Sequence, residues 1–237
     1  MNKILTLIFV LFALIMPIAA QSFLQMGLDI DGEAAEDESG TSVCMPDGNT
    51  IAIGAYLNDG SSLNIGHVRI YSWNGSEWLQ KGEDIEGEAD QDRLGWSLDM
   101  PDNNTIAIGA YLNDGSEINS GHVRIYNWNG SAWIQKGADI DGEAADDRSG
   151  WSVSMPDANT VAIGAYQNGG NGNDAGHVRI YVWNEVAWIQ KGGDIDGEVA
   201  EDLSGHAVSM PDANTVAIGA HRNDAGSYHA GHVRIYF

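Results

Sequence analysis

Residues 161–166 read Val-Ala-Ile-Gly-Ala-Tyr, and residues 176–181 read Gly-His-Val-Arg-Ile-Tyr. The second segment occurs four times unchanged, and the first occurs four times with Ile or Val at its start and Tyr or His at its end. The glycine of the first lies at Gly54, Gly109, Gly164 and Gly219, and that of the second at Gly66, Gly121, Gly176 and Gly231. Each copy follows the last by 55 residues without an insertion or a deletion. A period this regular is typical of one structural module repeated along the chain.

Each unit contains four short segments with strand patterns. In the third unit, residues 133–136 are aromatic and β-branched, and residues 151–155 alternate apolar with polar before Pro156. Residues 161–165 form an unbroken run of small apolar residues, as in a strand buried on both faces. Residues 177–183 alternate strictly, and no segment has helical periodicity of useful length. The sequence therefore predicts four antiparallel strands per unit.

Four such strands in each of four repeats predict an all-β fold, a β-propeller of four four-stranded blades. The last unit ends at Phe237, directly after its His-Val-Arg-Ile-Tyr strand. The missing fourth strand has a counterpart at the other terminus, because residues 22–27 align with residues 77–82. We expect this N-terminal strand to pair with the last blade, which would close the ring and remove the open edges. The alternatives are an open arc, or part of a larger ring completed by a second copy.

The N-terminus has the layout of a secretory signal peptide. Lys3 precedes an apolar run from Ile4 to Met16, and the small residues Ala19 and Ala20 follow. This pattern predicts a signal peptide over residues 1–20 and one repeat domain over residues 21–237, with secretion to the periplasm, the cell surface or the medium.

The chain is strongly acidic, with 34 Asp and Glu against 11 Lys and Arg and a net charge of −23. Such a surface repels nucleic-acid phosphate, so a nucleic-acid partner is not expected. Membrane insertion is not expected either, because no later segment approaches the length of a spanning helix. Cys44 is the only cysteine, so no disulfide can form within the chain. Polar residues occupy its position in the other units, and we do not expect a reactive thiol.

The order of elements resembles the FG-GAP repeat of integrin α-subunit propellers and of bacterial surface proteins. The pairs that correspond to its Phe-Gly are Ser39-Gly40, Leu94-Gly95, Ser149-Gly150 and Ser204-Gly205. The triplets that correspond to its Gly-Ala-Pro begin at Gly54, Gly109, Gly164 and Gly219. The resemblance implies a β-propeller that binds partners outside the cell.

Two departures from this family bear on function. Its members often hold calcium in the hairpin between the first two strands, whereas this hairpin has a single carboxylate, at Asp47, Asp102, Asp157 or Asp212. The usual metal site therefore cannot be carried over. The family also commonly forms seven blades, which four units cannot supply.

The acidic residues concentrate instead in the loop between units, Asp29-Ile-Asp-Gly-Glu-Ala-Ala-Glu-Asp and its copies. Calcium takes six to eight oxygen ligands, so it is an ion that these loops could hold. The candidate metal ligands are Asp29, Asp31, Glu33, Asp37, Asp84, Glu86, Asp139, Asp141, Asp147, Asp194, Asp196 and Asp202. The spacing matches an EF-hand only in part. The alternative is that the carboxylates cap turns and solvate an exposed connection.

Basic residues recur on one strand face. His67, His122, His177 and His232 are each followed two residues later by an arginine, at Arg69, Arg124, Arg179 and Arg234. This set could receive an anionic ligand, but we expect pairing with the abundant carboxylates. The copies that break the pattern are His206, His221 and Arg222 in the fourth unit, which are the asymmetric candidates for a single site.

No catalytic motif is present. Acidic pairs recur in every copy, whereas catalysis needs one carboxyl group tuned differently from its neighbour. We therefore expect a secreted or cell-surface, non-enzymatic binding or adhesion module that presents its inter-blade loops to an extracellular protein or glycan. Trp73, Trp128 and Trp183 would suit such contact, although packing between blades is the expected use. The alternatives are a carbohydrate-active hydrolase and a purely structural repeat protein, and oligomerisation is open if one chain does not close the ring.

Overall fold

The computed structural model describes residues 23–237. The predicted signal peptide, residues 1–20, lies outside this range. All regular elements over residues 23–237 are β-strands, and they form four antiparallel sheets, one for each unit. Within these residues no helix is long and apolar enough to cross a membrane. The all-β class is thus confirmed.

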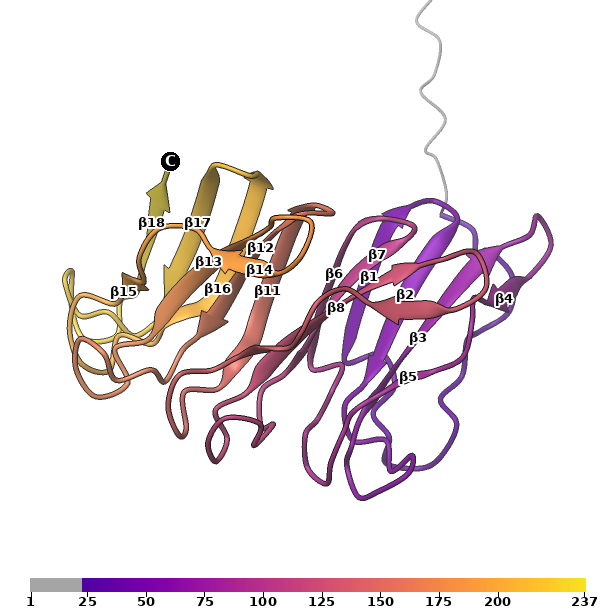
Figure 1. Ribbon diagram of the computed structural model, residues 1–237, viewed down its shortest axis with the longest axis horizontal. Coiled ribbons are helices and arrows are strands. Elements are labelled where there is room, and N and C mark those ends of the chain that lie inside the picture. The colour runs from indigo at the N-terminus through magenta and orange to yellow at the C-terminus, as the bar shows by residue number, and fades with distance from the viewer. Residues whose placement is uncertain (1–22) are drawn as a thin grey trace, which may run out of the picture.

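The sheets share one plan (Figure 1). The first contains β1 (Ser42–Asp47), β2 (Thr50–Ala55), β3 (His67–Trp73), β4 (Trp78–Gln80) and β5 (Ile85–Glu86). The second contains β6 (Ser97–Asp102), β7 (Thr105–Ala110), β8 (His122–Trp128), β9 (Trp133–Gln135) and β10 (Ile140–Asp141). The third contains β11 (Ser149–Asp157), β12 (Thr160–Ala165), β13 (His177–Trp183), β14 (Trp188–Gln190) and β15 (Ile195–Asp196). The fourth contains β16 (Ser204–Asp212), β17 (Thr215–Ala220) and β18 (His232–Tyr236).

The four strands predicted for each unit are present in the first three sheets. The central strands are buried on both faces, as the small apolar runs indicated; every residue of β7 and of β12 is buried. A fifth, two-residue strand was not predicted. It lies in the acidic segment and pairs with the start of the third strand, where Ile85 faces Val68 and Glu86 faces His67. Together these strands bring the acidic segment against the histidine strand.

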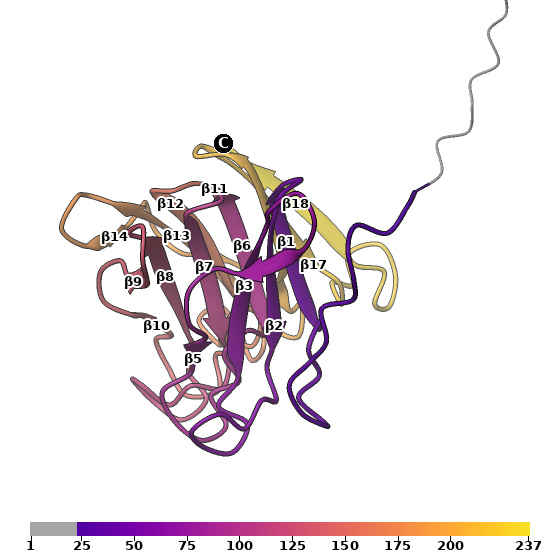
Figure 2. The same cartoon turned by 90° about the vertical axis from the view of Figure 1, so that its right-hand side faces the viewer.

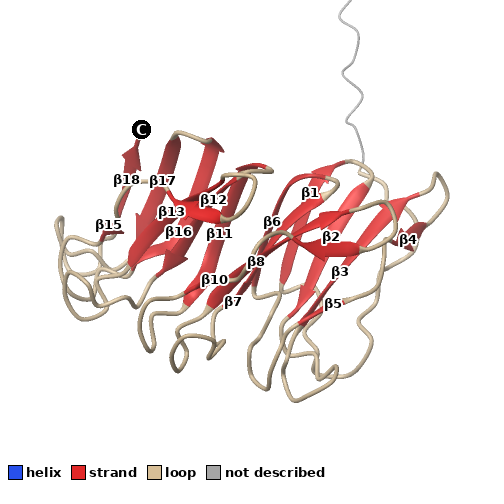
Figure 3. Ribbon diagram, in the orientation of Figure 1, coloured by secondary structure: helices blue, strands red, loops and turns tan. Residues whose placement is uncertain are grey.

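The sheets stack side by side along the chain, with the first and the last at opposite ends (Figures 1 and 3). Figure 2 shows the same stack turned by 90°, with the first sheet facing the viewer. Apolar clusters fill the space between neighbours. Val68 and Ile70 of the first sheet pack with Met100, Ile106 and Ile108 of the second, and the same contact recurs between the later sheets. The core is therefore a series of sheet-on-sheet interfaces, which makes the fold propeller-like.

The predicted closure by the N-terminal strand is wrong for the described chain. The fourth sheet has only three strands, and Phe23 and Leu24 are almost fully exposed, as is Phe237 at the other end. The physical reason is that the N-terminal segment is held at its own end of the array. The indole Nε1 of Trp78 donates a 2.9 Å hydrogen bond to the carbonyl of Met26, and Gly27 lies against Trp73. The four sheets form an open arc.

Candidate functional site

Among the described residues, three equivalent clusters of one glutamate, one histidine and one aspartate lie where the acidic loops meet the third strand of a sheet. In each cluster the three ligand-type atoms lie within 4.8 Å of one another. The clusters are Glu33, His67 and Asp84; Glu88, His122 and Asp139; and Glu143, His177 and Asp194. The glutamate and the aspartate come from successive acidic loops, so the sheet order brings together residues far apart in sequence.

The histidine of each cluster is buried and close to a carboxylate. His67 Nδ1 lies 3.5 Å from Asp84 Oδ2, and His122 Nδ1 lies 3.6 Å from Asp139 Oδ2. Burial lowers the pKa of His67, His122 and His177 below the usual value, which favours the neutral imidazole. Neither ring nitrogen of His122 has a hydrogen-bond partner among the described residues.

The adjacent arginines lie on the same strand face and pair with the same glutamates. Arg69 Nη1 lies 3.4 Å from Glu33 Oε1, while Arg69 Nη2 donates a 2.8 Å hydrogen bond to the carbonyl of Asp31. Arg179 repeats both contacts with Glu143 and Asp141. The predicted pairing with carboxylates is confirmed for the arginines, and it fastens each acidic loop to its sheet. The histidines, whose neutral form burial favours, lie 3.5 to 3.9 Å from a carboxylate oxygen.

The twelve predicted metal ligands divide into groups with different surroundings. Glu33, Asp84, Asp139 and Asp194 belong to the clusters. Asp37, Asp147 and Asp202 are buried and close their loops; Asp37 accepts hydrogen bonds of 3.0 Å from the Ala34 amide and from Asn58. Glu86, Asp141 and Asp196 lie in the fifth strands opposite the histidines, and Asp29 and Asp31 are exposed. The carboxylates of a single acidic loop therefore do not converge on one position that a metal ion could occupy.

The cluster histidines and the glutamates Glu88 and Glu143 were not among the predicted ligands. The sequence indicated the histidines in part, because they recur with the same 55-residue period as the acidic loops. The hairpin between β1 and β2 is as short as predicted. Its carboxylate Asp47 accepts a 2.7 Å hydrogen bond from the Asn49 amide, which caps the turn. These residues do not fit the calcium loop of the FG-GAP family.

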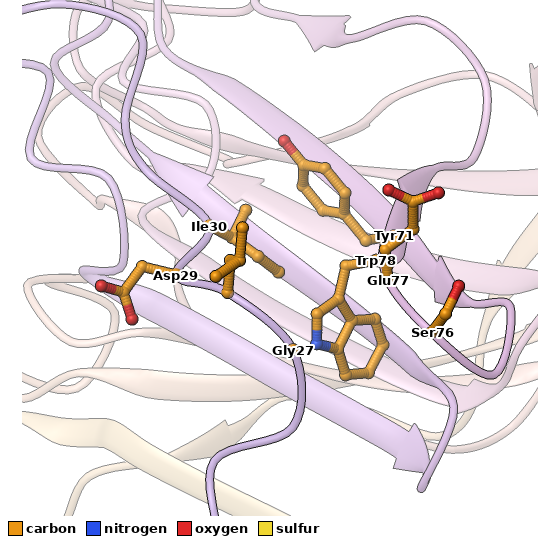
Figure 4. A pocket seen from close by; sticks show the side chains of 8 residues that line it. Gly27, Asp29, Ile30, Tyr71, Ser76, Glu77 and Trp78 are labelled. Atoms are coloured by element: carbon orange, nitrogen blue, oxygen red, sulfur yellow. The ribbon is translucent and has the colours of Figure 1, made fainter.

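A hollow bordered by an aromatic pair lies beside three of the sheets. The first has a volume of 510 Å³ and is lined by Tyr71 and Trp78 from the sheet and by Gly27 to Ile30 from the chain that precedes it. Figure 4 shows Tyr71 and Trp78 on one side and Asp29 on the other, with its carboxylate turned away from the indole. Burial raises the pKa of Tyr71, so its hydroxyl is protonated at neutral pH and can donate a hydrogen bond.

The same hollow recurs at the next two sheets. Tyr126, Trp133 and Asp84 line one of 210 Å³, and Tyr181, Trp188 and Asp139 line one of 240 Å³. Trp128 and Trp183 each lie beneath a lysine of the preceding unit, Lys81 or Lys136, with the ammonium nitrogen 5.3 Å from the ring centroid, so the predicted packing between blades is confirmed for these two. Trp73 contacts Trp78 at 5.4 Å between ring centroids, and Trp128 and Trp183 make the equivalent contacts.

The asymmetric residues of the fourth unit lie at the end of a ribbon of ring side chains. The ribbon runs across the sheets through Tyr56, Trp96, Tyr111, Trp151, Tyr166, His206 and His221, with neighbouring centroids 4.3 to 5.7 Å apart. Burial lowers the pKa of both histidines, and the nearby charge of Arg222 lowers it further. Because His206 takes the position of Trp151 in this ribbon, its surroundings are those of a packing residue.

Cys44 is half-buried, and its Sγ lies 3.5 Å from Asp99 Oδ1. Burial, and then the charge of Asp99, raises the pKa of the thiol to about 11. A thiol protonated at neutral pH is a poor nucleophile, which agrees with the prediction from the sequence.

Comparison with known proteins identifies the repeat. Residues 139–181 match the family model of the FG-GAP repeat, which confirms the resemblance drawn from the sequence. No curated protein matches the chain. Among solved structures, the Hadza microbial sialidase Hz136 aligns with 85% of this chain at 11% identity and a TM-score of 0.30. The chain spans about half, 52%, of the length of that structure.

Proposed function

We propose that this chain is a secreted or cell-surface, non-enzymatic binding module whose inter-sheet segments bind an extracellular glycan. The observation that carries this proposal is the hollow lined by a tryptophan, a tyrosine and a carboxylate-bearing segment, repeated beside three sheets. Aromatic faces pack against the apolar faces of sugar rings, while hydroxyl and carboxylate groups bind sugar hydroxyls. The first hollow, at 510 Å³, has the volume of an ordinary small-ligand site, and the other two, at 210 and 240 Å³, are smaller.

Repetition favours binding over catalysis. Three similar sites on one rigid array can engage neighbouring residues of one polymer, so weak single contacts add up through effective concentration. A catalytic site instead needs one carboxyl group whose pKa is set apart from its neighbour. The candidate carboxylates Asp29, Asp84 and Asp139 occupy equivalent positions, which supports repeated recognition.

A glycan array with and without chelator tests this function. The variant Tyr71→Phe/Tyr126→Phe/Tyr181→Phe keeps the rings and removes only the hydroxyls. We expect at least a tenfold loss of binding to immobilised polysaccharide, with a smaller loss for each single variant because two sites remain. Tyr228→Phe is the matched control, since Tyr228 is exposed and lies outside the hollows.

Three outcomes would contradict the proposal. They are full binding by the triple variant, binding to extracellular proteins but to no glycan on the array, and turnover of the test polysaccharide by the purified chain.

The proposal includes a divalent cation in the histidine clusters. Each cluster offers one imidazole nitrogen and two carboxylates, a mixed donor set that suits zinc or manganese better than calcium. The buried, unpartnered nitrogens of His122 support it. The paired arginines oppose it, because a guanidinium already occupies one oxygen of Glu33.

Melting curves with zinc, manganese, calcium or chelator test the cation, because a ligand bound only by the folded state raises the midpoint. We expect zinc or manganese to raise it, and the rise to shrink in Asp84→Asn/Asp139→Asn/Asp194→Asn. Asp29→Asn is the matched control, because Asp29 is the same position in the repeat and belongs to no cluster. An equal midpoint with every metal and with chelator would contradict cation binding.

A further inference from the structure

The outer face of the fourth sheet exposes side chains that the other sheets bury. Val233 and Ile235 of β18 are 67% and 68% exposed. Their equivalents one sheet earlier, Val178 and Ile180, pack against the fourth sheet, and those two sheets earlier, Val123 and Ile125, are 0% and 1% exposed. We call the outer face of β17 and β18 the tail face. It is the same surface that each earlier sheet presents to its successor.

The opposite end of the array shows the complementary half of this interface. Val43 and Met45 of β1 are 60% and 51% exposed. The methionines equivalent to Met45 are Met100, Met155 and Met210, and they are 4%, 2% and 6% exposed because each packs on the preceding sheet. We call the outer face of β1 and β2 the head face. It is the surface that each later sheet presents to its predecessor.

At Gly219, on the tail face, no contact among the described residues requires a glycine. A Cβ at Gly54, Gly109 or Gly164 would meet the carbonyl oxygen of a glycine in the next sheet at 2.2, 2.1 or 2.0 Å. A Cβ at Gly219 would meet nothing closer than 3.6 Å, and its φ is not positive. A hollow of 350 Å³ lies there instead, lined by Gly219 and Gly231 among others. The glycine is explained if a neighbouring backbone lies in this hollow.

The segment that would enter this hollow is present at the other end of the array. The carbonyls against Gly54, Gly109 and Gly164 belong to Gly95, Gly150 and Gly205, and the equivalent glycine of the first unit is Gly40. A Cβ at Gly40 would meet nothing within 4 Å. Backbone hydrogen bonds from Ser149 to Ser120 and from Ser204 to Ala175, both 2.9 Å, cross the internal boundaries beside these contacts. If this pattern of hydrogen bonds continued for one more unit, the amide of Ser39 would donate to the carbonyl of Ala230.

The N-terminal segment is also placed as if it belonged to a preceding sheet. Trp133 and Trp188 donate 2.7 Å hydrogen bonds to the carbonyls of Lys81 and Lys136, which directly follow a fourth strand. Trp78 does the same to the carbonyl of Met26. Residues 23–25 therefore occupy the position of a fourth strand, and no third strand lies beside them within residues 23–237. The fourth sheet shows the converse, because no described strand pairs with the outer edge of β18.

We propose that two copies of this chain associate head to tail. The head face of one copy packs on the tail face of the other, Gly40 of the first enters the hollow at Gly219 of the second, and residues 23–25 add as a fourth strand beside β18. This contact would repeat the interface that already joins the sheets within the chain, so the partner that fits these faces is a second copy. The interface is heterologous, because different surfaces of the two copies meet.

Two features of the contact differ from the internal ones. Ser42, Ser97 and Ser152 each donate a hydrogen bond to the glycine carbonyl of the next sheet, whereas the fourth unit has Ala207 at this position. The contact between copies therefore has one hydrogen bond fewer than each contact between sheets within the chain. The net charge of −23 also makes the copies repel each other. Association should strengthen with salt, because salt screens this repulsion and leaves apolar packing intact.

Sedimentation velocity in about 0.5 M salt, where the Debye length is only about 4 Å, tests the proposal with two blocked variants. Val43→Glu/Met45→Glu blocks the head face, and Val233→Glu/Ile235→Glu blocks the tail face. We expect the unaltered chain to form dimers or larger species and each blocked variant to be monomeric. An equimolar mixture of the two should form a 1:1 dimer, because it restores one intact head and one intact tail. Val186→Glu, an exposed valine outside both faces, is the control and should associate as the unaltered chain does.

A monomeric unaltered chain at every concentration would overturn the proposal. So would self-association of either blocked variant, because this would indicate contact between like faces. A mixture that stays monomeric while the blocked variants keep their fold, checked by circular dichroism, would also overturn it.

Crosslinking tests the added strand separately. The internal register pairs Tyr181 with Gln190, so Tyr236 should face the partner's Gln25. In a Cys44→Ser background, Gln25→Cys/Tyr236→Cys oxidised with glutathione disulfide should give covalent oligomers, whereas Gln25→Cys/Val186→Cys should not. Equal crosslinking of both variants would remove residues 23–25 from the contact. This inference does not rest on glycan binding, because each experiment has its own variants and readout.

Discussion

The second and fourth sheets have nearly the same sequence in their second and third strands, yet their burial differs. All six residues of β7 are buried, whereas burial in β17 alternates between buried and intermediate. Val123 and Ile125 are inaccessible, and their equivalents Val233 and Ile235 are two-thirds exposed. The difference arises because the second sheet has a neighbour on each side and the fourth has one. In this fold the neighbour determines what a given residue contributes to stability.

The largest expected contrast comes from truncating the same isoleucine in each sheet. Ile125→Ala should lower the free energy of unfolding by about 2 to 5 kcal/mol, because it removes buried atoms and leaves a cavity. Ile235→Ala should change it by less than about 0.5 kcal/mol in dilute protein, as at an exposed site. Urea unfolding at low protein concentration measures both, and equal losses would contradict an uncovered fourth sheet.

The next contrast comes from adding a methyl group to a glycine. Gly164→Ala forces a Cβ against the carbonyl of Gly205 and should cost about 1 to 3 kcal/mol through displacement of the next sheet. Gly219→Ala meets open space and should leave the isolated chain as stable as before, while weakening association between copies. Thermal melts and sedimentation of the two variants check this, and a destabilised monomeric Gly219→Ala would contradict it.

The burial of three histidines predicts that the free energy of unfolding depends on pH, with a smaller effect than the substitutions above. Burial lowers the pKa of His67, His122 and His177 in the folded chain, so the unfolded chain binds protons more readily. The stability from the neutral imidazoles is complete above the unfolded pKa of about 6.5 and is lost as the pH falls below it. Unfolding in chelator between pH 8 and pH 5 measures this slope. Replacing the three histidines with glutamine should flatten it, whereas His229→Gln, at an exposed position, should not.

The smallest effect on stability is expected at Cys44, which lies on the face of β1 that packs against the second sheet. Cys44→Ser should change the free energy of unfolding by less than about 0.5 kcal/mol, since serine occupies this position in the third and fourth units. The thiol itself should be alkylated on the order of a hundredfold more slowly at pH 8 than an unperturbed cysteine, because its pKa is about 11. Fast alkylation in the dilute chain would show that the thiol is not held as described.

The strands could be predicted from the sequence because the patterns that specify them are local. Alternation in residues 177–183 and the apolar run in residues 161–165 fall within single elements, and the structure places β13 and β12 there. The two-residue strand at Ile85 was missed because so short a segment carries no periodicity. Closure of the ring could not be predicted, since it depends on how far each sheet rotates from the last.

The candidate site was less accessible to sequence analysis for a related reason. Glu33 and Asp84 lie in different acidic loops and meet only because both contact the strand of His67. Within one loop the carboxylates were expected to act together, but the structure gives Asp37 to the loop backbone and Glu33 to Arg69. Grouping the carboxylates by their spacing in the sequence therefore identified some residues of the site but not the residues that they contact.

Hydrogen exchange tests the open arc most directly, because β12 and β17 share the sequence Thr-Val-Ala-Ile-Gly-Ala and differ only in their neighbours. In dilute chain, the amides of β17 should exchange faster than those of β12, and the difference should narrow as protein concentration rises and copies associate. Equal protection of the two strands at the lowest concentration would contradict this account, because it would mean that the fourth sheet is covered within a single chain.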